Sequence, residues 1–172
     1  MRALRSIALY PSLPGDTAIE SIRARFDPLH DKVPYHITLV FPFDSILATA
    51  RLQAHVAEAC TGMASFSITT GEVICEGALV MLAIDDGAAQ IVELHRRLYR
   101  GLLNPFHDAR YAFRPHITVG RGLTREAVLA CAAEAGRLGT LHGVITTLAG
   151  EVIGQDDSST LEWVQGLGST ST

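Results

Sequence analysis

The sequence predicts a single α/β (α+β) domain on the basis of three observations. Helical and strand patterns alternate along nearly the whole chain, and their order almost repeats between the two halves. A four-residue pattern also occurs twice, beginning at positions 36 and 116. Helices interspersed with strands favour a layered domain. The near-repeat indicates two similar lobes that share one core.

The composition narrows the class of protein. Apolar residues make up 48% of the chain and charged residues 19%, which is enough to bury a core and excludes intrinsic disorder. A net charge of −4 argues against attraction to nucleic acid by bulk positive charge. The longest apolar run, residues 78–84, is far shorter than the roughly 20 residues that span a bilayer. Three cysteines without a C-x-x-C pair indicate no disulfide framework. We therefore expect a cytoplasmic protein with no membrane partner.

The first half of the chain contains six predicted elements. A strand over residues 4–10 ends at Pro11, and Thr17 and Glu20 form a capping-box pattern before an amphipathic helix. A strand over residues 33–40 is closed by Phe41-Pro42-Phe43. A helix over residues 45–60 follows, then strands over residues 66–74 and 78–84, the last apolar throughout and so expected to be buried on both faces.

The second half follows a similar order. A helix over residues 91–102 must end before Asn104-Pro105. Next come a strand over residues 111–119, a helix capped by Thr124 and running to about residue 138, and strands over residues 144–153 and 160–164. The small polar residues 166–172 predict a flexible tail, so the single domain spans residues 1–165.

The repeated pattern is His36-Ile37-Thr38-Leu39 in the first half and His116-Ile117-Thr118-Val119 in the second. Side chains alternate between the two faces of a strand, so each histidine shares a face with its threonine, while the apolar residues face the core. If the lobes are related by an approximate two-fold axis, two imidazoles and two hydroxyls meet around one point.

This constellation suits a phosphodiester. One neutral imidazole can accept a proton while a protonated one donates to the leaving oxygen, and threonine hydroxyls can bind the non-bridging oxygens. No metal or other cofactor is required. Arginines cluster around the second copy of the pattern, and Arg114 shares strand parity with His116, so we expect it to bind phosphate. Arg121 is a second candidate, although parity alone leaves its direction open.

Other residues and motifs are less informative. Phe41 or Phe43 could stack on a base, but core packing is favoured for both. His95 lies on the apolar stripe of its helix and is expected to pack there with a bonded ring nitrogen. The sequence has no P-loop, no complete dinucleotide fingerprint, no G-x-S-x-G elbow and no H-E-x-x-H metal motif.

At these residues the sequence resembles the 2H phosphoesterase superfamily, and within it the bacterial proteins described as 2′-5′ RNA ligase-like or RNA 2′,3′-cyclic phosphodiesterases. The resemblance is carried by H-I-T-L at residues 36–39 and H-I-T-V at residues 116–119, and by the flanking residues 39–43 and 113–115. The order of elements agrees over nearly all of residues 1–165. The resemblance implies a bilobal fold: two pseudo-two-fold-related lobes of mainly antiparallel sheet, with helices outside and a central cleft.

The resemblance also implies a function. The expected activity is metal-independent hydrolysis of 2′,3′-cyclic phosphates or 2′-5′ linkages in nucleotides or RNA ends. His36 would be the proton donor and His116 the proton acceptor, although these roles could exchange, and Thr38 and Thr118 would bind phosphate. A non-catalytic RNA- or nucleotide-binding module of the same fold is the alternative. We expect a monomer with no obligatory protein partner.

Overall fold

The computed structural model describes residues 2–110 and 112–168. Within these residues the strands are β1 (Ala3–Leu9), β2 (Ile37–Ser45), β3 (Phe66–Glu76), β4 (Leu79–Ile84), β5 (His116–Gly120), β6 (His142–Ile145), β7 (Thr147–Ile153) and β8 (Ser159–Gly166). The helices are α1 (Thr17–Phe26), α2 (Thr49–Ala59), α3 (Ala88–Leu98) and α4 (Arg125–Ala135), with a 3-10 helix, η1 (Gly101–Phe106). None of these helices is long and apolar enough to cross a membrane.

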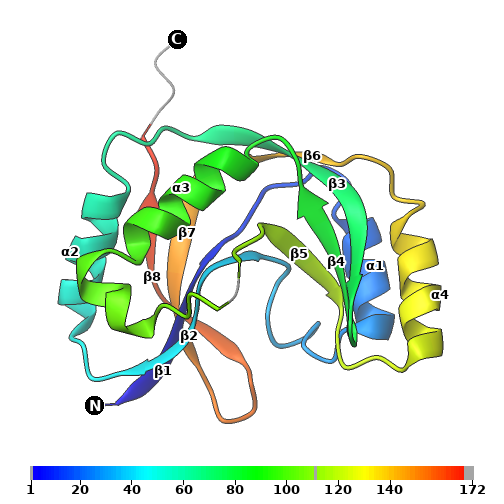
Figure 1. Ribbon diagram of the computed structural model, residues 1–172, viewed down its shortest axis with the longest axis horizontal. Helices are drawn as coiled ribbons and strands as arrows, with labels where there is room; N and C mark the ends of the chain where they lie inside the picture. The colour runs from blue at the N-terminus through cyan, green and yellow to red at the C-terminus, as the bar shows by residue number, and fades with distance from the viewer. Residues whose placement is uncertain (1, 111, 169–172) are drawn as a thin grey trace.

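The strands form two four-stranded antiparallel sheets that lie side by side (Figure 1). Sheet 1 has the order β2-β1-β7-β8, and sheet 2 has the order β5-β4-β3-β6. The two strands that carry the repeated pattern, β2 and β5, occupy matching edge positions, each paired with the strand that precedes it by one helix. The expected α/β fold of two similar lobes is therefore confirmed.

The helices are exchanged between the lobes. Helix α1 follows β1 of sheet 1 in the chain, yet it packs against β5 of sheet 2 and beside α4. Helix α3 follows β4 of sheet 2, yet it packs against β2 of sheet 1 and beside α2 (Figure 1). Each sheet is thus covered on one face by a pair of helices, one of them from the other lobe's strand–helix unit. One continuous apolar core runs through both lobes.

The apolar spacing explains how the elements pack. In α3, Ile91, Leu94 and Leu98 are fully buried against sheet 1, and each contributes about 1.5–3 kcal/mol on leaving water. Strand β4 is an interior strand buried from Val80 to Ile84, as its continuous apolar run predicts. The predicted cap of α4 is also confirmed, because Thr124 Oγ1 accepts a hydrogen bond from the Ala127 N–H at 3.3 Å.

Several predicted boundaries are wrong. The N-cap of α1 is Asp16, and no side-chain cap bond forms, so the expected capping box at Thr17 is absent. Strand β2 begins at Ile37 and runs through Pro42, where the sequence predicted its end. Proline is tolerated there because β2 is an edge strand. Strand β5 begins only at His116, and Tyr111, the first residue of the predicted strand, lies outside the described residues.

Other differences come from breaks that the sequence does not mark. The strand predicted over residues 144–153 is two strands, because the chain leaves sheet 2 after β6 and enters sheet 1 as β7. Helix α2 begins at Thr49, and α3 ends at Leu98, with η1 continuing through Pro105. Of the expected tail, Gly166 ends β8, and the Gly168 N–H donates to the Met63 carbonyl at 2.9 Å. Residues 169–172 lie outside the described part of the chain.

Candidate active site

The two copies of the repeated pattern alternate between sheet faces as the sequence predicts. Ile37 and Ile117 are fully buried on the faces that the helices cover. The side chains of His36 and Thr38, and those of His116 and Thr118, are partly exposed on the opposite faces. We call these opposite faces the motif faces of sheet 1 and sheet 2. Each motif face therefore presents one imidazole and one hydroxyl.

Each imidazole is anchored in the same way. His36 Nδ1 lies 2.8 Å from the Pro34 carbonyl oxygen, and His116 Nδ1 lies 2.7 Å from the Arg114 carbonyl oxygen, each two residues earlier in the chain. A carbonyl can only accept, so Nδ1 carries the proton in both rings. Nε2 is then the atom that can accept or donate a proton in chemistry. The hydroxyls of Thr38 and Thr118 have no hydrogen-bond partner within the described residues, so they too are available to a ligand.

Both histidines are biased toward the neutral form. Burial lowers the pKa of His36 from its ordinary value of 6.5, opposed by the bond to the Pro34 carbonyl and assisted by the nearby positive charges of Arg23 and Arg121. Burial likewise lowers the pKa of His116, and Arg121 lowers it further. A perturbed pair of imidazoles on facing elements is typical of a proton-transfer site.

Arg121 connects the two halves of the site. Its guanidinium lies close enough to both imidazoles to lower the pKa of each. Strands β2 and β5 are also in contact across the boundary between the sheets. Arg121 is therefore within electrostatic reach of both copies of the pattern.

A β-bulge directly after each threonine explains why Arg121 reaches the site. Thr38 pairs with Ala8, but Val40 pairs with Ile7, so Leu39 is an extra residue in β2. The same shift occurs in sheet 2 around Val119, which lies between the pair formed by Thr118 and Met81 and the pair formed by Gly120 and Val80. A bulge reverses the alternation of the residues that follow it.

The reversed alternation turns Phe41 and Arg121, which occupy equivalent positions 80 residues apart, onto the motif faces. Gly120 points to the helix side, where a Cβ would come within 2.8 Å of Cys131 Sγ on α4. The expectation that Phe41 packs in the core is wrong, since its side chain is 50% exposed. Phe43 does pack in the core, against Phe106.

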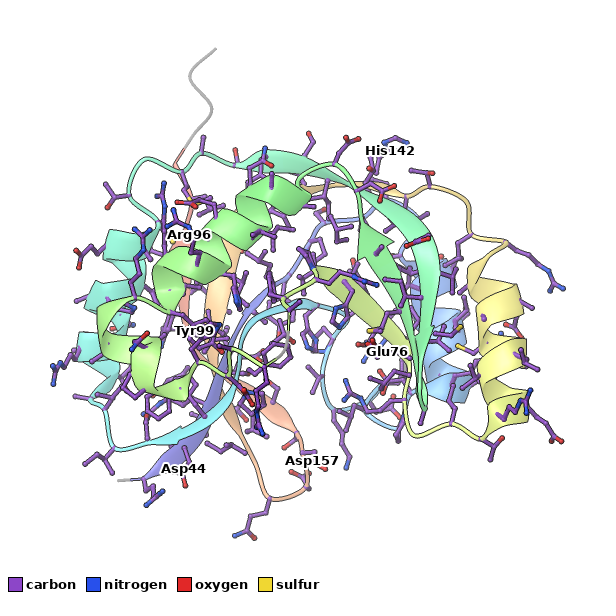
Figure 2. All side chains as sticks on the ribbon, viewed as in Figure 1. Asp44, Glu76, Arg96, Tyr99, His142 and Asp157 are labelled. Carbon is purple, nitrogen blue, oxygen red and sulfur yellow. The ribbon has the colours of Figure 1, made fainter. Side chains whose placement is uncertain are left out.

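The backbone N–H groups of Phe41 and Arg121, which follow the two bulges, also make equivalent hydrogen bonds. Phe41 lies in edge strand β2 and Arg121 directly follows edge strand β5, so their N–H groups need acceptors outside the strand ladder. The Phe41 N–H donates to the Tyr99 hydroxyl at 3.1 Å, and the Arg121 N–H donates to the Phe26 carbonyl at 2.9 Å (Tyr99 is labelled in Figure 2). Helix α1 or the end of α3 thus fixes each bulge.

His95 and Phe113 connect the first motif with the residues that directly precede the second motif. His95 is buried, and its Nδ1 lies 2.8 Å from the carbonyl oxygen of Leu39, the bulge residue. Its ring stacks on Phe113 at a centroid distance of 3.7 Å, three residues before His116. The expected packing role of His95, with a bonded ring nitrogen, is confirmed.

A buried ion pair on α1, Arg23 with Asp27, was not predicted from the sequence. Arg23 Nε lies 3.1 Å from Asp27 Oδ2, and the two side chains are only 2% and 3% exposed. Arg23 Nη2 donates to the Val33 carbonyl at 2.7 Å, close to the start of the first motif. Asp27 Oδ1 lies 3.8 Å from Arg121 Nε. Arginine is seldom fully buried, so no sequence signal pointed to this pair.

The remaining predicted arginine has a simpler environment. Arg114 is exposed, and its charge contributes to lowering the pKa of His116. Arg110, from the same stretch, is paired with Asp108 at 2.7 Å. A surface hollow of about 530 Å³ lies elsewhere, between α2 and η1, and has none of the motif residues in its lining, which includes Arg51 and His55. No group of three metal-ligating side chains occurs among the described residues.

Two antiparallel sheets whose matching edge strands each carry a histidine–threonine motif are the arrangement that the resemblance to 2H phosphoesterases implies. Solved structures share the fold over nearly the full length of the chain. Escherichia coli LigT complexed with 3′-AMP has a TM-score of 0.66 at 15% identity, covering 97% of this chain and 99% of that one. The TT0787 protein of Thermus thermophilus has a TM-score of 0.64 at 16% identity, covering 98% and 100%.

Sequence comparison agrees with the fold. A Halalkalibacterium halodurans protein named a "putative phosphoesterase" is 30% identical over 125 residues, which cover 69% of this chain and 70% of that protein. A Bacillus licheniformis protein of the same description is 29% identical over 124 residues, with the same coverage. The family model of the 2′-5′ RNA ligase superfamily matches residues 11–149, and the chain belongs to that superfamily.

Proposed function

We propose that the protein is a phosphodiesterase that hydrolyses 2′,3′-cyclic phosphates, or 2′-5′ linkages, of nucleotides or RNA ends by paired-histidine acid–base catalysis. The observation that supports this most directly is the matching pair of imidazoles, each with Nδ1 fixed by a carbonyl and Nε2 left for proton transfer. A module that only bound its ligand would need neither proton-transfer group.

The proposed reaction uses one imidazole for each proton. Neutral His116 accepts a proton from water at Nε2 as the water oxygen bonds to phosphorus. The phosphorus bond to one ribose oxygen breaks, and His36, protonated at Nε2, gives its proton to that oxygen. The product is a phosphomonoester, and exchange with solvent restores both histidines. In a nearly symmetric site the same groups can serve in exchanged roles.

The other proposed site residues bind the phosphate. The hydroxyls of Thr38 and Thr118 would donate hydrogen bonds to the non-bridging oxygens, where negative charge builds during attack. Arg121, which lies near both imidazoles, supplies a fixed positive charge, and Arg114 adds a second on the side of His116. Phe41, turned onto the motif face by the bulge, offers a ring on which a base can stack.

The test is an assay of the purified protein in EDTA with 2′,3′-cyclic nucleotides and 2′-5′ dinucleotides. His36→Ala and His116→Ala should each lower kcat by about 10²–10⁴, with little change in substrate affinity. His142→Ala, an exposed histidine at the start of β6, is the matched control and should retain full activity. Unchanged turnover in both motif variants would refute the mechanism. Ligand binding without any turnover by the natural protein would instead identify a binding module.

A further inference from the structure

We infer that the site takes a small substrate with a single phosphate and an uncharged organic body lying on the motif face of sheet 1, and that it disfavours an extended RNA strand. This inference rests on the proposed function and specifies its substrate class. It is carried by the distribution of charge and apolar surface around the two motifs.

The motif face of sheet 1 is largely apolar beyond Thr38. Strand pairing places Ala8, Ala149 and Val164 in one row with Thr38 across the sheet. The next row contains Ser6, Glu151 and Leu161. Leu161 is 59% exposed, and Val164 and Phe41 are exposed as well. Ala8 and Ala149 are themselves buried, so the apolar side chains that this face exposes are Phe41 after the bulge in β2 and Leu161 and Val164 on β8.

The acidic and basic side chains of sheet 1 do not provide a positive surface on this face for a polyanion. Glu151 is buried, and Ser6 Oγ donates to its Oε2 at 3.0 Å. Arg5 points to the helix face, where it pairs with Glu162 at 2.8 Å. Arg2, just before β1, is paired with Asp44 at 2.6 Å at the far end of the sheet. Within the described strands of sheet 1, the motif face thus presents no arginine or lysine.

The motif face of sheet 2 also offers no further positive charge beyond Arg114 and Arg121 within the described strands. Glu76 shares the motif face with Thr118, through the pairing of Met81 with Ile74 and of Leu79 with Glu76. Figure 2 shows Glu76 on the side of the sheet away from α4. Its negative charge acts on His116, so it lies near the reacting groups. Beside the positive charges of Arg114 and Arg121, the next ionised group on this face is an acid.

A nucleic-acid strand needs more than this arrangement offers. Proteins that hold single strands use a positively charged groove along the backbone, with several stacking side chains. Here the arginines lie around the two motifs, and the motif faces of the described strands beyond them present no arginine or lysine. On the described strands of the two motif faces a second phosphate would meet no further arginine or lysine, whereas one phosphate with a nucleoside-sized body fits the charge pattern.

The test compares two substrates with the same reacting end: 2′,3′-cyclic AMP, and an octaribonucleotide whose 3′-terminal adenosine carries the cyclic phosphate. We expect kcat/KM to be at least about tenfold higher for the mononucleotide. It should change less than about threefold between 50 and 200 mM salt, since a strand held at many phosphates would lose far more. Faster turnover of the octamer with a steep salt dependence would overturn the inference.

Two variants of Leu161 test whether the organic body of the substrate lies on sheet 1. Leu161→Glu should raise KM for the mononucleotide several-fold with kcat unchanged, and Leu161→Ala should raise it less. Leu129→Glu is the matched control, because Leu129 is 66% exposed on α4, away from the motif faces. An unchanged KM in both Leu161 variants would show that the body does not lie on sheet 1.

Binding separates this inference from the proposed function. The natural protein is titrated with 3′-AMP and with an octaribonucleotide ending in a 3′-phosphate, whether or not it turns over either cyclic substrate. Absence of turnover with preferential binding of 3′-AMP would count against the catalytic proposal alone. Tighter binding of the octamer would overturn the inference alone.

Discussion

Arg121 Nε lies 3.8 Å from Asp27 Oδ1, so a buried carboxylate at the end of α1 supports a cation that lowers the pKa of both His36 and His116. Asp27 is itself held by Arg23 Nε at 3.1 Å and by the Leu29 N–H at 3.0 Å. Helix α1 thereby fixes a guanidinium that lies directly after β5.

Asp27→Asn should weaken substrate binding, because Arg121 loses its carboxylate partner. We expect KM to rise several-fold and the protein to become less stable, since the charge of buried Arg23 is left without its partner. The negative charge of Asp27 raises the pKa of His36, so its loss should lower that pKa. Kinetics at a temperature well below the new Tm, with an NMR titration of His36, measure both effects. Loss of stability with an unchanged KM and an unchanged His36 titration would show a purely structural role.

Arg121→Gln should raise the pKa of both His36 and His116. The positive charge of Arg121 lowers both values, so its removal shifts both titrations upward, toward the ordinary value of 6.5. NMR titration of the ligand-free protein measures this directly, and the pH profile of kcat/KM should move in the same direction. Arg121→Lys keeps the charge and is the control. Movement of only one histidine would contradict a shared position for Arg121.

Arg114→Gln and Glu76→Gln should each shift the pKa of His116 without shifting that of His36. Arg114 lowers and Glu76 raises the pKa of His116, whereas neither contributes to the shift of His36. The first variant should therefore raise, and the second lower, the pKa of His116 alone. In the pH profile of kcat/KM, the limb that moves in opposite directions in the two variants belongs to His116. Movement of the acid limb would make His116 the base, and movement of the alkaline limb would make it the acid.

The folded protein should lose stability as the pH falls below about 6.5. Burial lowers the pKa of His36, His95 and His116 in the folded state, so the unfolded chain binds more protons in that range. The stabilisation is present above the unfolded pKa and is lost as the pH falls toward the folded values. Urea unfolding at pH 7.5 and pH 5 should show it. His95→Asn should flatten this dependence while lowering stability at pH 7.5 through loss of the ring stack on Phe113. An undiminished slope in that variant would exclude His95 as a contributor.

The paired motifs and the two-lobed fold were predictable because both depend on local patterns: strand alternation around His36 and His116, and apolar spacing along α3. The direction of Phe41 and Arg121 was not predictable, because the bulges after Thr38 and Thr118 arise from pairing with β1 and β4. The division of residues 144–153 between two sheets likewise depends on tertiary pairing. The roles of the motif residues and of Arg114 remain predictions for the assays above.

The exchange of α1 and α3 between the lobes has a consequence for how such a chain can be assembled. A fragment ending at the β3–β4 turn would leave α1 without β5 to pack on, and β2 without α3. Neither half can complete its own lobe, but two copies of one half-chain could complete each other's. The arrangement is that of an intertwined symmetric dimer joined into one polypeptide, with the two histidine–threonine motifs on matching strands at the boundary between its halves.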